Sequence, residues 1–412
     1  MLVLIIPRFH AMICGMCWQP RCAPGNSWSR MARTRRVSRK LYIGWQRHLA
    51  QTEWCDVYVT PTGIIATVYH HGEHRTRIQR IIRSGVDLSR VAGVLEVSRA
   101  ASALTPQQAR ERLEQVATQP RLYGRWLTTA AVGVACACPS TLFGGAMLEW
   151  LITFIAAALA FLARDWMHHH NVSRPLMAGI AAFLAAGIAH GLALLFSALF
   201  AAQAISASVL FLVPGVPLVS AMVDLFRGDT VSGVARLASA MLMIVAISAG
   251  VWAMLLVTQA QMNLDPGRLD VLLLAVPLAF LSACGFAIMF DVPRQALLIA
   301  ALVGAIGYSV FRLAGLMGLP TGAAAFLAGT TISALAELLA RPFRLPTSIF
   351  TIPGFLPLVP GAAAFRTLLH FAADDYTNGI EGLVRTTIIV IALAAGIGTI
   401  SALARLGRRP AV

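Results

Sequence analysis

Proline and glycine interrupt two apolar segments of this chain. The first segment holds Pro214, Gly215 and Pro217, and the second holds Pro353, Gly354, Pro357, Pro360 and Gly361. Proline removes a backbone donor and clashes with the preceding turn, so both segments are expected to form kinked or broken helices. A broken helix exposes unpaired N–H groups that can hold a carboxylate. We therefore predict a binding site for a small anionic molecule at the two breaks, with a structural kink as the alternative.

Two further side chains near the breaks are candidates for binding that molecule. Arg366 follows Pro360 by six residues, and an arginine at membrane depth is costly unless it faces a cavity or a partner. We predict that its guanidinium binds a substrate carboxylate; snorkelling to the interface is the alternative. Ser220 stands at the matching position of the first segment.

Three titratable side chains in apolar segments are candidates for carrying a proton: Asp224, His190 and Glu337. Each also has a structural interpretation. Asp224 precedes Arg227 by three residues and Glu337 precedes Arg341 by four, which is the spacing of helix ion pairs. His190 lies in the middle of its segment, where a hydrogen-bonded packing histidine is the alternative to a proton relay.

The sequence lacks the common signatures of enzymes. It has no GxxxxGK[ST], HExxH or GxSxG motif. Cys14-x-x-Cys17 has no second CxxC and no histidine at zinc spacing, so no metal site is predicted. We predict no catalytic residue and no cofactor; a membrane enzyme that uses the N-terminal region is a disfavoured alternative.

The composition is that of a membrane protein. Of the 412 residues, 58% are hydrophobic and 12% are charged, whereas a soluble domain carries about 25% charged residues. The net charge of +15 is concentrated in residues 1–125, which hold 19 Lys and Arg against 7 Asp and Glu. Basic residues beside a bilayer set topology and contact anionic lipid. The sequence has no basic surface with interleaved aromatic residues, so we do not predict nucleic-acid binding.

The second half of the apolar region repeats the first. Three short motifs recur in order, at offsets of 143, 146 and 149 residues: Gly179–Ala185 as Gly322–Ala328, Leu212–Gly215 as Leu358–Gly361, and Gly233–Arg236 as Gly382–Arg385. One such match arises easily by chance in an Ala/Leu/Gly-rich chain, but three collinear matches indicate an internal duplication.

The hydrophobic pattern predicts a mainly α membrane protein of about ten transmembrane helices, preceded by a small α+β domain. The expected spans are 126–145, 147–163, 175–198, 204–224, 232–258, 269–290, 294–311, 321–340, 347–371 and 383–404. The expected parts are an unassigned basic segment (1–52), an α+β domain (53–124), a first five-helix repeat (125–260) and a second one (261–412). Five spans per half place the halves in opposite senses, which makes a 5+5 inverted repeat.

Two local features shape the predicted α+β domain. Thr60-Pro61-Thr62-Gly63 is a turn signal between two β-rich runs. Thr105-Pro106-Gln107-Gln108 has the residues of a helix start, with threonine as the N-cap and glutamine three residues later.

Arginine placement predicts the orientation in the membrane. With a cytoplasmic N-terminus, the inside loops hold Arg164, Arg174, Arg227, Arg294, Arg341 and Arg344, and the C-terminus adds Arg405, Arg408 and Arg409. The outside loops carry few basic residues. This is the positive-inside pattern, and it predicts that both termini are cytoplasmic.

At several of these segments the chain resembles the threonine/serine exporter family. The resemblance covers about residues 52–405 and is carried by Asp56–Gly63, Gly85–Val91, Ala109–Leu113, Phe143–Gly145, Val213–Leu218, Asp224–Gly228 and Gly233–Arg236. It implies a cytoplasmic N-terminal domain, about ten spans, and export of small hydroxy amino acids driven by the proton motive force. Some bacteria encode the two halves as separate proteins, and that version is linked to dicarboxylate export.

The sequence therefore predicts a secondary exporter of threonine and serine in the bacterial inner membrane. Its expected partners are the substrate, protons and the lipid bilayer, and a homo-oligomer is one option for its assembly. An exporter of dicarboxylates such as succinate is the alternative within the same class. A passive channel is the alternative from another class, and it predicts flux that persists without an ion gradient.

Overall fold

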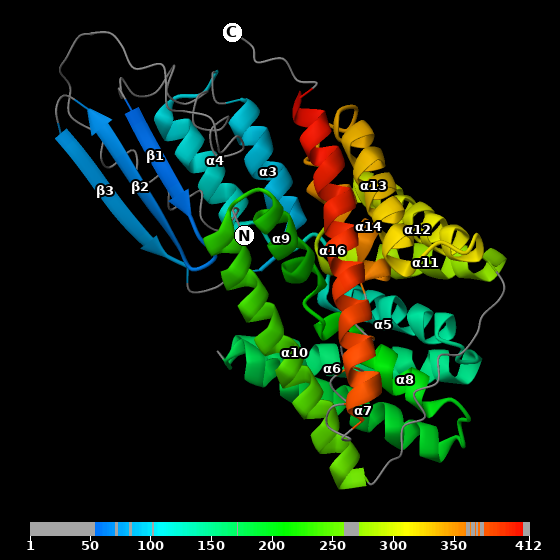
Figure 1. Ribbon diagram of the computed structural model, residues 1–412. Coiled ribbons are helices and arrows are strands. Elements are labelled where there is room, and N and C mark those ends of the chain that lie inside the picture. The colour runs from blue at the N-terminus through cyan, green and yellow to red at the C-terminus, as the bar shows by residue number, and fades with distance from the viewer. Residues whose placement is uncertain are drawn as a thin grey trace. The chain divides into compact units, whose positions relative to one another are not determined.

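The computed structural model describes residues 54–70, 73–81, 85–100, 103–170, 172–258, 272–359, 363, 367, 370 and 375–406. The segment 1–52 and the predicted site residues Pro360, Gly361 and Arg366 lie outside the described residues. The chain divides into two compact units, Met1–Leu122 and Tyr123–Val412 (Figure 1). Each unit is described by itself.

The first unit contains a three-stranded antiparallel sheet in the order β1-β2-β3, formed by β1 (Trp54–Val59), β2 (Gly63–His70) and β3 (Glu73–Arg80). The predicted turn joins β1 to β2, where the amide of Thr60 donates to the carbonyl of Gly63 at 2.8 Å. Alternate residues of β2 (Ile64, Ala66 and Val68) are buried on one face. The sequence did not predict β3, whose charged and exposed residues lack an apolar alternation.

Two helices follow the sheet, α3 (Leu88–Arg99) and α4 (Pro106–Thr118). They pack through Val94 and Val97 of α3 and Leu113 of α4. The predicted start of α4 is confirmed, because Thr105 and Gln108 form a capping box.

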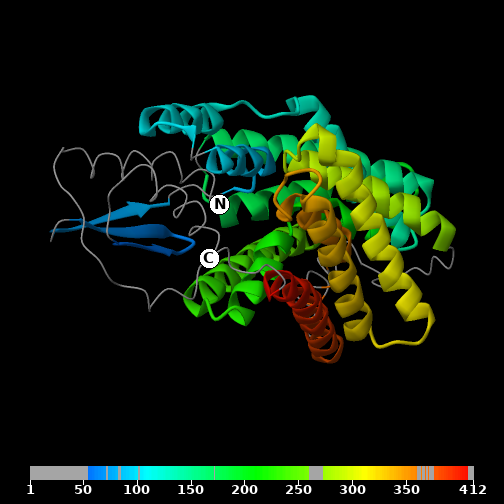
Figure 2. The same ribbon diagram turned by 90° about the horizontal axis from the view of Figure 1, so that it is seen from above.

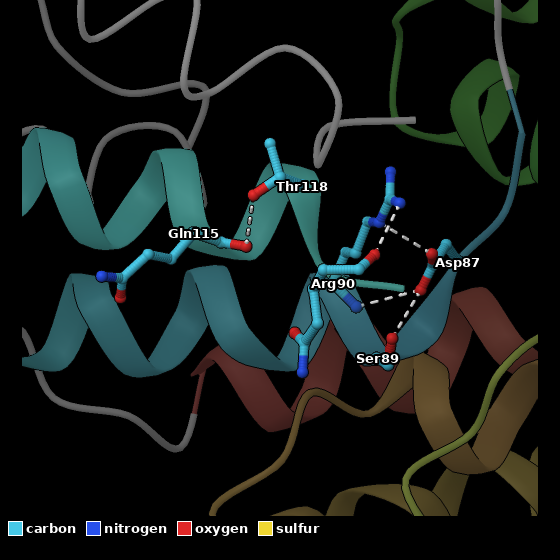
Figure 3. A network of polar contacts seen from close by, with 6 residues as sticks. Asp87, Ser89, Arg90, Gln115 and Thr118 are labelled. Atoms are coloured by element: carbon cyan, nitrogen blue, oxygen red, sulfur yellow. Dashed lines mark hydrogen bonds and ion pairs between the residues drawn. The ribbon is translucent and has the colours of Figure 1, made fainter. Parts of the chain in front are cut away.

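A polar network joins the start of α3 to the end of α4 (Figure 3). Asp87 caps α3 by accepting from the amide of Arg90 at 3.0 Å. The guanidinium of Arg90 also lies 3.0 Å from the Asp87 carboxylate and donates to the carbonyl of Gln119 at 3.0 Å. The resemblance motif Gly85–Val91 therefore has a structural role in this unit.

The second unit is helical. Its elements are α5 (Arg125–Leu142), α6 (Met147–His169), α7 (Arg174–Leu195), α8 (Ala201–Ser208), η3 (Leu210–Leu212), α9 (Gly215–Phe226), α10 (Thr230–Thr258), α11 (Leu272–Met289), α12 (Arg294–Leu316), α13 (Thr321–Ala340), α14 (Ser348–Phe355), η4 (Leu356–Leu358) and α16 (Tyr376–Leu406).

Six helices in the described residues are long and apolar enough to cross a membrane: α6, α7, α10, α12, α13 and α16. The pair formed by α8–η3 and α9 makes a seventh if it is one span, with a bend of 58°. The apolar segments of α11 (Leu274–Met289) and α14–η4 (Ser348–Leu358) are shorter. The chain is therefore a mainly helical, multi-pass membrane protein, as predicted; six or seven full-length spans fall within the described residues, and the ten-span arrangement stays a prediction.

Corresponding helix pairs of the two halves are in contact, and α13 lies beside α16 in both views (Figures 1 and 2). α7 packs on α10, and α13 packs on α16. Glycine allows both contacts, because a side chain at Gly250 would meet the carbonyl of Gly179, and one at Gly396 would meet the carbonyl of Phe326. Small residues at such crossings let backbones approach closely, which is how membrane helices associate.

The first helices of the two halves, α5 and α11, also pack on each other. The hydroxyl of Ser282 on α11 donates to the carbonyl of Ala135 on α5 at 2.9 Å. α5 then turns sharply into α6, and Gly144 adopts a φ of 96° in that turn. This contact joins the two halves at equivalent elements.

Candidate functional site

The first break lies between α8–η3 and α9. Val213 is extended there, with φ −61° and ψ 127°, and Pro214 follows it with φ −77° and ψ 57°. A residue before proline is pushed out of the helical region, so Val213-Pro214 ends one helix and Gly215 begins the next. Pro214 and Gly215 are both buried. The break is therefore an internal feature of the helical unit.

The second break has the same backbone. η4 ends at Leu358, and Val359 has φ −62° and ψ 125°, within two degrees of the values at Val213. Leu358-Val359 therefore repeats the backbone of Leu212-Val213, as far as the described residues extend. The helix α14 runs through Pro353 and Gly354, within the segment that the sequence predicts to be kinked or broken. Gly354 instead permits close packing, because a Cβ there would lie 2.9 Å from Ile332.

The two breaks lie against each other. A Cβ built on Gly215 would be 3.0 Å and 3.1 Å from the two methyl groups of Val359, and 3.4 Å from the side chain of Leu356. The side chains of the second break therefore leave little room for a side chain at Gly215. The structure thus brings Gly215, a predicted binding residue, to the place where both halves are interrupted.

Buried polar residues on α8 were missed by the sequence analysis. Gln203 is 7% exposed, and Ser206 and Ser208 are fully buried. The Ser208 hydroxyl donates to the carbonyl of Ile205 at 2.8 Å, whereas the Ser206 hydroxyl has no hydrogen-bond partner within the described part of the chain. The signal in the sequence was a group of polar residues just before the Val-Pro-Gly break. The matching positions on α14 are apolar (Ile349 for Gln203, Ile352 for Ser206).

The turns after the two breaks are closed by equivalent backbone hydrogen bonds. The amide of Asp229 donates to the carbonyl of Asp224 at 3.0 Å, and the amide of Asp375 donates to the carbonyl of His370 at 2.9 Å. Both pairs are related by the offset of 146 residues that relates the breaks. The duplication therefore extends from the broken helices into the turns that follow them.

The side chains in these two turns differ. Asp224 forms an ion pair with Arg236 of α10 at 3.2 Å, a partner that the sequence analysis did not name. His370 replaces Asp224 in the second turn, and its Nδ1 lies 2.9 Å from the carboxylate of Asp375. The Asn378 side-chain amide donates to this carboxylate and, together with His370, holds the pKa of Asp375 below its ordinary value. Asp375 is therefore ionised at neutral pH.

The other predicted residues lie on separate elements. Ser220 is half-buried within α9, His190 is half-buried on α7, and Glu337 is half-buried on α13. The three proton candidates Asp224, His190 and Glu337 therefore belong to three different helices.

A second residue that the sequence analysis missed is Glu149, near the start of α6. Its side chain is 2% exposed. Its carboxylate accepts from the amide of Ala146 at 2.8 Å and from the amide of Phe200 at 3.1 Å. The signal in the sequence was an isolated carboxylate at the third position of a helix, three residues after its N-cap Ala146.

Apolar helices of membrane length and a pair of matched helix breaks define a multi-pass membrane protein with the architecture of a secondary transporter. The sequence comparisons agree with this class. A family model described as putative threonine/serine exporter matches residues 46–258, and a second, described as threonine/serine exporter, matches residues 275–403. The chain belongs to the threonine/serine exporter family.

The chain is similar to several individual proteins. It is 26% identical to a probable threonine/serine exporter of Mycobacterium tuberculosis over 370 residues, which cover 83% of this chain and 68% of that one. It is 26% identical to the threonine/serine exporter of Corynebacterium glutamicum over 321 residues, covering 75% of this chain and 65% of that one. A probable succinate transporter subunit of Klebsiella aerogenes is 32% identical over 197 residues, covering 47% of this chain and 75% of that protein. No solved structure matches the chain.

Proposed function

We propose that this protein exports threonine and serine across the bacterial inner membrane by secondary active transport. The observation that carries the proposal is the contact between the two matched breaks, where Gly215 lies against Val359 and Leu356. Paired interruptions in corresponding helices of two repeats mark the substrate site in many transporters. The names of the relatives from Mycobacterium tuberculosis and Corynebacterium glutamicum give further support.

The proposed substrate site combines two groups with complementary chemistry. Gly215 begins α9; its own amide donates to the carbonyl of Val213 at 2.8 Å, so the amide of the next residue, Val216, is the donor that we assign to the substrate carboxylate, which a helix start favours. Ser206 on α8 offers a buried hydroxyl with no hydrogen-bond partner in the described residues, which suits the hydroxyl or amino group of the substrate. Arg366 remains our candidate from the sequence for a second contact to the carboxylate.

The proposed topology has ten spans arranged as a 5+5 inverted repeat, with both termini in the cytoplasm. The equivalent packing of α7 on α10 and α13 on α16 supports two repeats, and the arginine distribution supports the orientation. Single cysteines introduced in a cysteine-free protein test it. At exposed Leu199 and Met317 they should react with an impermeant thiol reagent from outside intact cells, and at exposed His169 only after the membrane is opened. Labelling of His169→Cys in intact cells would contradict the orientation.

The proposed driving force is the proton gradient. Asp224, His190 and Glu337 are our candidates from the sequence for moving the proton, and they lie on α9, α7 and α13. Inverted membrane vesicles provide the test, because export appears in them as uptake. Labelled threonine and serine should accumulate when respiration energises the vesicles, and an uncoupler should abolish the accumulation.

Two other outcomes of the vesicle test point to the alternatives. Gradient-dependent uptake of succinate without uptake of threonine or serine would favour a dicarboxylate exporter, an alternative supported by the 32% identity to the succinate transporter subunit. Uptake that persists without a gradient and shows no counterflow would indicate a passive channel. Absence of any of these fluxes would refute transport of these molecules.

The substrate site is tested by two neighbouring serines of α8. Ser206→Ala should raise the threonine concentration needed for half-maximal transport about ten-fold, since one lost hydrogen bond is worth about 1.4 kcal/mol. Ser208→Ala is the matched control: Ser208 is equally buried, but its hydroxyl is already bonded to Ile205. Equal effects of the two substitutions, or none from Ser206→Ala, would remove Ser206 from the site.

A further inference from the structure

Glu149 is a buried carboxylate that ties two helix starts together. Only 2% of the residue is exposed. One carboxylate oxygen accepts from the amide of Ala146, just before α6, and the other accepts from the amide of Phe200, just before α8. The two oxygens therefore hold the beginning of α8 against the beginning of α6.

This carboxylate differs from other acidic groups of the helical unit in how its charge is balanced. Asp165 lies 3.3 Å from the guanidinium of Arg125, and Asp224 lies 3.2 Å from that of Arg236. Within the described ranges, Glu149 has no cationic side chain at ion-pair distance and accepts only from backbone amides. Among the residues that the structure describes, Glu149 is therefore held by two backbone amides and not by an ion pair.

The neighbouring helices supply few other titratable groups. α5 carries Cys136 and Cys138, α7 carries His190, and α8 carries none. The basic residues of α5 and α7, Arg125 and Arg174, stand at the first positions of those helices. Glu149 instead follows the turn after the last residue of α5.

Glu149 is also connected to the broken helix that carries the proposed substrate site. The hydroxyl of Thr153, one turn further along α6, donates to the carbonyl of Glu149 at 2.6 Å and lies 3.5 Å from the carbonyl of Ala204 on α8. α8 leads through η3 to the break at Val213. The contacts of Glu149 and Thr153 therefore fix the position of α8, which bears Ser206.

From these contacts we propose that Glu149 binds the coupling proton, an inference that rests on the proton-driven export proposed above. In the proposed orientation Glu149 lies at the outer ends of α6 and α8, where protons enter. A proton from the outside binds one carboxylate oxygen, and the resulting O–H is a donor that no longer accepts from a backbone amide. The tie between α6 and α8 then weakens, which lets the empty transporter carry the proton inward, whereas the threonine-loaded protein moves outward with Glu149 ionised. Loss of the same proton to the cytoplasm restores both hydrogen bonds.

The test uses the full-length protein in liposomes and measures two reactions. Glu149→Gln should lower pH-gradient-driven accumulation of threonine at least ten-fold and abolish the proton flux reported by an internal pH dye. It should leave threonine–threonine counterflow within two-fold of the original, because exchange needs the substrate site but no net proton movement. Glu381→Gln is the matched control, since Glu381 is exposed on α16 and its substitution should alter neither reaction.

Each remaining outcome decides the proposal. Gradient-driven accumulation by Glu149→Gln would overturn the proposal. Loss of both counterflow and accumulation in a correctly folded Glu149→Gln protein would also overturn it, because Glu149 would then be only a structural helix cap. If Glu149→Gln does not fold, Glu149→Asp is used, and an unchanged pH profile of export would then overturn the proposal. If the original protein shows neither accumulation nor counterflow of threonine or serine, the proposed function itself fails.

Discussion

The two broken segments of this protein share a backbone but differ in their side chains. Val213 and Val359 have nearly the same dihedral angles, and the turns after both breaks close through equivalent hydrogen bonds. Yet α8 carries buried Gln203 and Ser206 where the matching positions of α14 hold isoleucine. The turns likewise pair Asp224 with Arg236 in one half and His370 with Asp375 in the other.

Duplication of the sequence provides two similar backbones, whereas binding of a substrate requires particular polar side chains. A repeated backbone can build two matched breaks and bring them together, because packing depends on small residues and helix ends that both copies retain. A single substrate needs one set of polar contacts. In the described residues, the first half carries buried polar side chains on α8 and α6, and the positions of α14 that match Gln203 and Ser206 are apolar.

The largest expected effect comes from filling the contact between the breaks. Gly215→Val places methyl groups where Val359 and Leu356 already lie. Overpacking of this kind costs about 1–3 kcal/mol, so we expect transport to fall about ten-fold or more while the protein still inserts. The measurement is threonine transport per molecule of protein in the membrane. Gly191→Val is the control, since Gly191 is exposed on α7 and has open space at its Cβ. Comparable losses in both variants would mean that the contact between the breaks is unimportant.

The second-largest expected effect is on the free energy of unfolding, and it compares the turn that contains Asp224 with its counterpart in the second half. Arg236→Gln leaves the carboxylate of Asp224, which is 19% exposed, without its ion-pair partner. Removing one member of a half-buried pair should cost about 1–2 kcal/mol of unfolding free energy, between the values for exposed and buried pairs. The repeat provides the control: Arg385, the counterpart of Arg236, is exposed, and Arg385→Gln should change stability by less than about 0.5 kcal/mol. Thermal unfolding of the purified variants measures both, and equal shifts would show that the turns are energetically alike.

The smallest effect compares the glycines that start the repeated Gly-x-x-Arg motif. A Cβ at Gly233 would lie 2.6 Å from Leu225 and 3.0 Å from the carbonyl of Ala221, whereas one at Gly382 would lie 2.5 Å from the hydroxyl of Thr367. The hydroxyl can rotate away but the backbone carbonyl cannot, so Gly233→Ala should destabilise by about 1 kcal/mol more than Gly382→Ala. Thermal unfolding again gives the comparison. Thr367→Ala should restore the stability of Gly382→Ala; failure to do so would place the strain elsewhere.

Local patterns explain what the sequence predicted. The Val-Pro-Gly motif predicted the break at Val213, and the Thr105 capping box predicted the start of α4, because both depend on residues next to each other. In the second segment the helix runs through Pro353, and the helical residues end at Leu358, at the start of the repeated Leu-Val-Pro-Gly motif. Glu149 was missed because its second amide donor, Phe200, is 51 residues away. Contacts of that range depend on how the helices assemble, and no local pattern records them.

The glycine contacts have a consequence for how the protein can be divided. α7 packs on α10 and α13 packs on α16, so each pair closes within its own half. The two family matches also end and begin on either side of the segment between α10 and α11. Each half should therefore fold in the membrane as a separate polypeptide, and the packing of α5 on α11 provides a surface on which two such polypeptides can dimerise. On this view, a gene cut between residues 258 and 272 should still yield a complete transporter when both pieces are produced in one cell.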